Sequence, residues 1–280
     1  MTLTRTLWLP VLTMAVSALA THLFISGDTR WINNDLEQEW DTLLAPVPLQ
    51  PLYVPPDDVA ENTADAITLP VERTLSDTVE GTDIWERLRA GFDFPQQSAP
   101  SVQVHFDNYR RHPRHVEQIL QRGEPYLFYI LGRLEARGLP TELALLPVIE
   151  SAFDPFSSSP AGAAGLWQFM PATAKQVGLH QDWWFDGRRD IVAATEAALD
   201  YLSELHQRFD GDWLQALAAY NAGRARVNKA IRLNRSGGEP VDFWHLPLPE
   251  ETRNYVPKLL ALRAIISSPE AHNIILPEMA

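Results

Sequence analysis

The spacing of apolar residues changes near residue 80, where helical periodicity begins and continues to about residue 267. It predicts helices over 83–92, 113–121 and 124–137. Glycines follow the second and third of these segments at positions 123 and 138, where helices commonly end. The apolar positions that carry the period of the third segment are Tyr126, Leu127, Ile130, Leu131 and Leu134.

The segment 141–153, TELALLPVIESAF, has apolar residues all around a helical axis, which predicts a deeply buried helix. Further helices are predicted over 190–209, 212–221 and 250–267. Asp190 and Asp212 suit the N-caps of the first two, and Gly223 suits a C-cap. Only the stretch 101–106, SVQVHF, has the alternation of a short strand. The predicted fold class is therefore mainly α.

The N-terminus has the features of an export signal. An apolar run over 7–20 follows Arg5 and ends in Ala18-Leu19-Ala20, the small-x-small pattern of a signal-peptidase site. The run continues through 23–25 and so reaches about the length of a short membrane span. Residues 1–20 are therefore expected to be a signal peptide or, as the alternative, a membrane anchor.

The acidic residues are concentrated near the N-terminus. Residues 21–100 hold 15 acidic and 4 basic side chains, whereas 101–280 hold 21 and 18. The Pro-rich, aperiodic segment 21–79 is expected to be a disordered linker, followed by a folded domain over 80–270 and a tail over 271–280. Neither part has the basic stripe that binding of phosphates needs, so no nucleic-acid partner is expected.

Cysteine is absent, which excludes disulfides, thiolate metal sites and cysteine nucleophiles. None of the eight histidines lies in an HExxH motif. His112 and His115, in HPRH, are expected to be exposed polar residues at a helix start rather than ligands, which disfavours a zinc peptidase.

Glu150 is the first candidate for chemistry. Leu143, Leu146, Pro147 and Glu150 are spaced i, i+3, i+4 and i+7, which places a carboxyl on an apolar helix face. Burial raises the pKa of such a carboxyl toward a range where it can deliver a proton at neutral pH. The alternative is a glutamate that turns outward to water or pairs with an arginine.

Two later motifs contain polar groups suited to a sugar ligand. The loop DPFSSSPAGAAGLWQFMP contains GLWQ at 165–168, where small residues permit close approach and the amide of Gln168 can both donate and accept. The second motif, AYNAG at 219–223, places Tyr220 and Asn221 at a predicted helix end. Taken singly, each also fits an ordinary turn or helix end with packed aromatic residues.

The chain contains, in this order, ES at 150–151, GLWQ, AYNAG and a tyrosine in the last predicted helix. Together these motifs resemble those of family 23 lytic transglycosylases, which are SLT-domain enzymes of the lysozyme superfamily. The resemblance is closest to the membrane-bound type D subfamily, and it covers about residues 80–270. The resemblance is carried by segments 140–179, 183–190 (WWFDGRRD), 198–202 (ALDYL), 211–223 and 248–262.

The resemblance implies a goose-type lysozyme-like helical domain with a substrate cleft over Glu150, which would be the single catalytic acid and base. It assigns the remaining positions to the substrate and the cleft: saccharide contacts from Ser159 and Gln168, packing on the sugar by Met170, orientation of carboxyl and ligand by Tyr220 and Asn221, and the cleft wall from Tyr255.

The chain departs from that subfamily in two ways. Its members carry C-terminal LysM glycan-binding repeats, whereas this sequence ends soon after the expected catalytic domain, and some carry a lipid-modified cysteine. Affinity for the wall is therefore expected to rest on the cleft or on another protein.

The implied reaction cleaves the β-1,4 bond between N-acetylmuramic acid and N-acetylglucosamine without water and leaves 1,6-anhydro-N-acetylmuramic acid ends. It calls for no metal and no organic cofactor. The implied partner is the peptidoglycan glycan strand, and the implied location is the bacterial periplasm or cell envelope, with inner-membrane anchoring as an alternative. The nearest carboxylate in sequence, Asp154, precedes Pro155 and is expected to start a turn.

Two other functions stay open. A hydrolytic muramidase would use the same acid, with water in place of the C6 hydroxyl. A non-catalytic wall-binding scaffold is disfavoured because the acid position holds glutamate.

Overall fold

The computed structural model describes residues 83–95 and 98–279, all of which belong to one of the two units into which the chain divides, Pro70–Ala280. The predicted signal or anchor over 1–20 and the predicted linker over 21–79 lie outside the described residues. Within the described residues no helix is both long and apolar enough to span a membrane.

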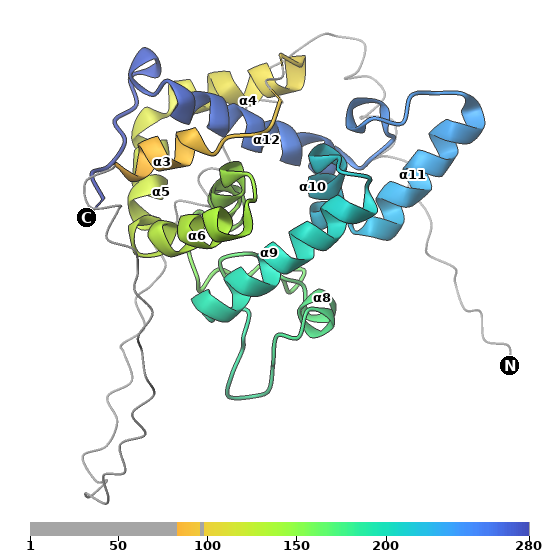
Figure 1. The fold of residues 1–280 in the computed structure, drawn as a ribbon, viewed down its shortest axis with the longest axis horizontal. Coiled ribbons are helices and arrows are strands. Elements are labelled where there is room, and N and C mark those ends of the chain that lie inside the picture. Colours follow the sequence, from red (N-terminus) through yellow and green to blue (C-terminus); the bar gives the residue numbers. More distant parts are fainter. Residues whose placement is uncertain (1–82, 96–97, 280) are drawn as a thin grey trace, which may run out of the picture. The chain divides into compact units, whose positions relative to one another are not determined.

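The described part is helical, as predicted, and its only β-type pairings are isolated bridges (Figure 1). Its elements are α3 (Ile84–Ala90), α4 (Pro100–Arg111), α5 (Pro113–Arg122), α6 (Glu124–Arg137), η1 (Thr141–Leu145), α7 (Leu146–Ser151), α8 (Pro171–Gln176), α9 (Ile191–Arg208), α10 (Trp213–Ala222), α11 (Arg224–Gly237), η2 (Phe243–His245), α12 (Glu250–Ser267) and η3 (Glu270–His272).

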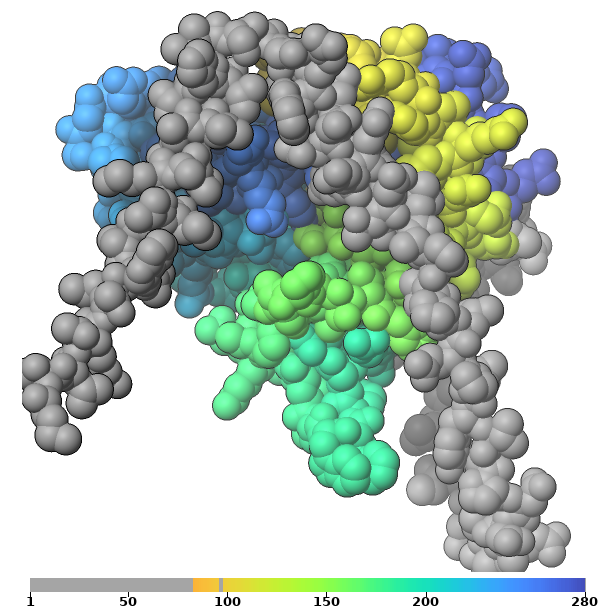
Figure 2. Space-filling model, turned by 180° about the vertical axis from the view of Figure 1, so that it is seen from behind, coloured from red at the N-terminus to blue at the C-terminus, as the bar shows by residue number. Residues whose placement is uncertain are grey.

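Helix α12 forms the centre of the packing. It lies against α4 along much of its length and also contacts α10, η1 and α7 (Figure 1). Val256, Leu259 and Ile265 on α12 are fully buried because they face these neighbours. On the face seen in Figure 2, the green surface of residues in the middle of the chain lies between the yellow surface of α4 and α5 and the blue surface of the later helices.

The predicted helix ends are largely confirmed. Asp190 caps α9 by accepting from the Ala193 N–H, and Asp212 caps α10 by accepting from Leu214 and Gln215. Gly138 ends α6 in the left-handed conformation. The last helix has the predicted bounds.

The strand-like alternation over 101–106 does not form a strand, because these residues lie in α4. Val102, His105 and Tyr109 are buried there at helical spacing, and Pro100 supplies a pre-set first turn. The alternation of SVQVHF was too short to separate the two periods, and packing against α12 decides in favour of the helix.

The single helix expected over 141–153 is divided into η1 and α7. Pro147 has no N–H to donate to Leu143, whose carbonyl instead accepts from the Leu146 N–H in a 3₁₀ pattern. The spacing from Leu143 to Glu150 therefore does not follow one α-helix, although the predicted burial of Leu143 and Leu146 is confirmed.

His115 is buried rather than exposed as expected. It lies on the inner face of α5 beside Val116 and Ile119, which are almost fully buried. Burial lowers the pKa of its imidazole to about 4. His112 lies between α4 and α5 and is only partly buried.

Candidate active site

Glu150 lies in the last turn of α7, which ends in an unusual way. Ala152 and Phe153 both have positive φ, at 50° and 58°, and their N–H groups donate to Val148 and Pro147. Such a conformation costs on the order of 1 kcal/mol per residue without glycine. Both residues are buried, and the Phe153 ring lies against Gly123, where a Cβ would approach it to 2.7 Å. Packing therefore holds the backbone that follows Glu150.

The carboxyl of Glu150 accepts a hydrogen bond of 2.5 Å at Oε1 from the hydroxyl of Tyr255, on α12. Burial raises the pKa of Glu150 to about 7, and the hydrogen bond from Tyr255 opposes this rise. The structure thus brings together two of the predicted site residues, 105 positions apart in sequence. A carboxyl with this pKa holds its proton on a large fraction of molecules at neutral pH.

A second carboxylate, which the sequence motifs do not indicate, acts on this group. The charge of Glu251, in the first turn of α12, adds to the rise in the pKa of Glu150. Asn221 donates to Glu251 at 3.2 Å and accepts from Thr252 at 2.8 Å. The polar pair that follows Pro249 was the available signal, but its partner could be seen only once α10 and α12 were placed together.

Tyr220, on α10, donates to the carbonyl oxygen of Trp167 at 2.8 Å. Burial raises its pKa well above the usual value, and the nearby charge of Glu150 adds to that rise. Trp167 is fully buried and donates to Thr195 at 3.0 Å. The alternative of a tyrosine packed inward and a core tryptophan is therefore partly correct, and these contacts join the GLWQ loop to α9 and α10.

The GLWQ turn depends on Gly165. Its φ is +82°, and a Cβ there would lie 1.8 Å from the Arg188 carbonyl oxygen. The Arg188 side chain in turn donates to the carbonyls of Gly162 and Phe169. Ser151, beside Glu150, donates to the Leu166 carbonyl at 2.9 Å. The loop is thus attached on one side to the 188 segment and on the other to α7.

Gln168 has a φ of +47°, and its side-chain amide donates to the carbonyls of Gly165 and Ser157. Its oxygen is the atom left for an external donor. Ser159 accepts from the Ala163 N–H at 3.0 Å, within its own turn. Met170 is 42% exposed just before α8. The structure therefore places Gln168, Ser159 and Met170 in one loop, where the first two support the turn.

Asp154 accepts from the Phe156 N–H at 2.8 Å and so starts a turn, as expected. Among the residues that the structure describes, no three histidine or acidic side chains are grouped as metal ligands would be.

The model of the Transglycosylase SLT domain family matches residues 131–242. The membrane-bound lytic murein transglycosylase D of Escherichia coli is 48% identical over 169 residues, which cover 60% of this chain and 37% of that protein. A putative tributyltin chloride resistance protein of an Alteromonas species is 42% identical over 149 residues, which cover 53% of this chain and 72% of that protein.

Among solved structures, an inactive mutant of the lytic transglycosylase Slt from Pseudomonas aeruginosa matches with a TM-score of 0.38 and 28% identity, over 51% of this chain and 24% of that chain.

Proposed function

Since the chain belongs to the Transglycosylase SLT domain family, we propose that it is a peptidoglycan lytic transglycosylase with Glu150 as its catalytic acid and base. The bond broken is the β-1,4 link between N-acetylmuramic acid and N-acetylglucosamine, and the product carries a 1,6-anhydro end. The lytic murein transglycosylase D relative supports this substrate, although the chain spans only 37% of its length.

One observation carries the proposal: a carboxyl with a pKa of about 7, held by a tyrosine hydroxyl. Because Tyr255 donates to Oε1, the proton that Glu150 delivers resides on Oε2. Glu150 gives this proton to the oxygen that leaves C1 of the muramic acid. The sugar's own acetamido group stabilises the electron-poor carbon while the bond breaks.

The second step uses the same carboxyl as a base. Glu150, now ionised, accepts the proton of the C6 hydroxyl as that oxygen closes on C1, so atoms balance without water. An intramolecular hydroxyl has an effective concentration of roughly 10⁵ M or more when well aligned. We assign alignment of the sugar to Gln168, Ser159, Met170 and Asn221, and the orientation of Glu150 to Tyr255 and Tyr220.

Hydrolysis is the second candidate, and Glu251 is the observation that favours it. Hydrolytic glycosidases commonly pair an acid with a second carboxylate that activates water. Glu251 lies near enough to raise the pKa of Glu150, yet it is exposed and engaged by Asn221.

The proposed setting is the bacterial cell envelope. The predicted signal or anchor over 1–20 supports export, and the name of the membrane-bound relative supports a location at a membrane.

Release of soluble muropeptides from purified peptidoglycan tests the proposal. Glu150→Gln keeps the shape of the side chain but has no proton to deliver, so we expect lysis to fall at least about a thousandfold. Glu204→Gln, at an exposed position on α9, is the matched control and should lyse at the wild-type rate. Lysis by the Glu150→Gln variant at near the wild-type rate would refute the assignment.

A further inference from the structure

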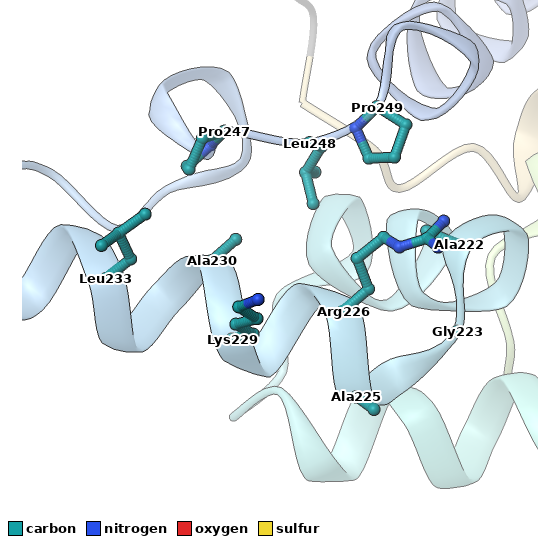
Figure 3. Close-up of a pocket in the computed structure, with 10 residues that line it drawn as sticks. All are labelled: Ala222, Gly223, Ala225, Arg226, Lys229, Ala230, Leu233, Pro247, Leu248 and Pro249. Carbon is teal, nitrogen blue, oxygen red and sulfur yellow. The ribbon is translucent and has the colours of Figure 1, made fainter.

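A groove of about 710 Å³ runs between α11 and the segment 247–249, outside the proposed catalytic group (Figure 3). Leu248 projects from that segment toward the helix, and Arg226 extends from α11 toward the end of α10 at Ala222. Lys229 and Ala230 line the helix side of the same groove. The walls therefore combine small apolar surfaces with two cations.

Helix α11 is strongly cationic. Arg224, Arg226, Lys229, Arg232 and Arg235 lie within its 14 residues, which contain no acidic side chain. Arg224 pairs with Glu204 at 3.4 Å. Arg226 and Lys229 are exposed and make no ion pair with the described residues. The groove therefore offers two uncompensated positive charges in a protein whose net charge is -13.

Both walls of the groove begin beside residues of the proposed site. Ala222 and Gly223 directly follow Asn221, and Pro249 directly precedes the turn that holds Glu251 and Thr252. Asn221 is hydrogen-bonded to both of these α12 residues, and the charge of Glu251 acts on Glu150, so contacts through Glu251 and Asn221 link the catalytic carboxyl to the residues at the edge of the groove. The groove therefore begins at residues that directly adjoin, in sequence, the Asn221–Glu251 pair near Glu150.

We infer that this groove binds the carboxylates of the peptide stem carried by the muramic acid whose bond is cleaved at Glu150. The inference rests on the proposed function. A stem combines alanine methyl groups with acidic side chains, which matches apolar walls of Ala222, Ala230 and Leu248 beside Arg226 and Lys229. Three to five residues span roughly 10–17 Å when extended, enough to pass from the sugar into a neighbouring groove.

The test compares two substrates: peptidoglycan with intact stems, and the same glycan stripped of stems by an amidase. The double change Arg226→Ala with Lys229→Ala should lower kcat/KM on intact peptidoglycan by roughly tenfold or more, since charge-assisted hydrogen bonds are lost. On stripped glycan it should leave kcat/KM unchanged. Arg232→Ala with Arg235→Ala removes the same charge from exposed positions of α11 outside the groove and should have no effect on either substrate.

Two further measurements test the groove without the double variant. The kcat/KM of the wild-type protein should fall by the same factor when the stem carboxylates of the peptidoglycan have been amidated. This measurement does not depend on the folding of a variant. The Glu150→Gln variant should bind peptidoglycan with intact stems more tightly than the glycan strands that the amidase leaves, which requires no turnover.

Equal losses on intact and stripped glycan, or equal losses in the control pair, would overturn the inference. Wild-type turnover without any preference for intact stems would overturn it alone and leave the proposed function standing. An inactive wild type would refute the proposed function, and the comparison of binding to intact peptidoglycan and to stem-free glycan would still test the groove.

Discussion

Burial, rather than a neighbouring negative charge, is the main cause of the raised pKa of Glu150. The charge of Glu251 adds to the rise, while Tyr255 and Lys258 lower it. The balance leaves the carboxyl with a pKa of about 7, close to the pH at which one group serves well both as an acid and as a base. Tyr255 therefore positions the carboxyl without making it too acidic to hold a proton.

The pH profile follows from this value. Bond cleavage needs protonated Glu150, so kcat/KM should fall about tenfold per pH unit above pH of about 7. Glu251→Gln removes a charge that raises the pKa, so the fall should begin at lower pH. Glu250→Gln, the adjacent exposed glutamate on α12, should leave the profile unchanged. A Glu251→Gln profile that matches the wild type would contradict the electrostatic role of Glu251.

The free energy of unfolding should also depend on pH through Glu150. The native state binds the Glu150 proton more tightly than the unfolded state, whose pKa is about 4.5, so the free energy of unfolding falls as pH rises from about 4.5 to 7. Glu150→Gln removes this dependence, so its stability relative to wild type should rise by about 2–3 kcal/mol between pH 4 and pH 8. Urea unfolding at both pH values measures the difference, and a constant difference would show that the pKa is not raised.

At the scale of elements, the short helix α7 and the GLWQ loop hold the site through backbone contacts. Ser151 bonds the Leu166 carbonyl, and Tyr220 bonds the next carbonyl, that of Trp167. Arg188 fixes the outer side of the loop through Gly162 and Phe169. The position of Gln168 thus depends on three separate segments of the chain.

Gly165→Ala tests this dependence. The new Cβ would meet the Arg188 carbonyl oxygen at 1.8 Å, so the 188 segment must move away from the loop. Gly162→Ala is a matched control, because its φ is also positive, +91°, and a Cβ there meets nothing within 4 Å.

We expect Gly162→Ala to cost about 1 kcal/mol of stability, and Gly165→Ala to cost at least about 2 kcal/mol more. Lysis should fall with Gly165→Ala alone. Equal melting temperatures for the two variants would show that the close approach at Gly165 does not matter.

The sequence predicted helices well where a capping residue stands at the end of a long segment with helical spacing of apolar residues. Asp190, Asp212 and Gly138 marked helix ends correctly, since each acts on its own backbone neighbours. The alternation over 101–106 did not reveal the helix there, which packing against α12 decides. The single helix predicted over 141–153 was wrong, because the missing N–H of Pro147 divides it. Helix α11 was not predicted, because most of its residues are polar or basic and only a narrow face, with Val227 and Ala230, is buried.

For the site, the motifs indicated Glu150 and, through the resemblance, Tyr255, whose hydrogen bond the structure contains. They did not indicate Glu251 or Thr252, because these residues meet Asn221 only through the packing of α12 against α10. The roles assigned to Ser159, Gln168 and Met170 in binding sugar stay predictions.

At the scale of the whole described unit, residues near its two ends lie together. The Trp85 indole N–H donates to the Pro277 carbonyl at 2.8 Å, and Trp85 is almost fully buried. The Ile275 N–H donates to Glu117, and Ile274 is buried. Helix α3 and the last described residues therefore both belong to the packed domain.

A chain that begins at Val79 should therefore stay folded and lyse isolated sacculi at the wild-type rate, since it keeps α3 and omits most of the segment predicted to be a linker. A chain that begins at Pro100 removes the buried Trp85 and Leu88 and should melt at a clearly lower temperature. Circular dichroism and lysis of sacculi measure both. Unfolding of the Val79 chain would place the domain boundary further toward the N-terminus.

The mass of the products formed from purified peptidoglycan tests the central claim most directly. If the C6 hydroxyl attacks C1 with Glu150 as the base, the muropeptides end in 1,6-anhydro-N-acetylmuramic acid and are lighter by one water than the products of a lysozyme digest. Mainly reducing ends that take up borohydride would contradict the account, because water, activated by a group such as Glu251, would then be the nucleophile.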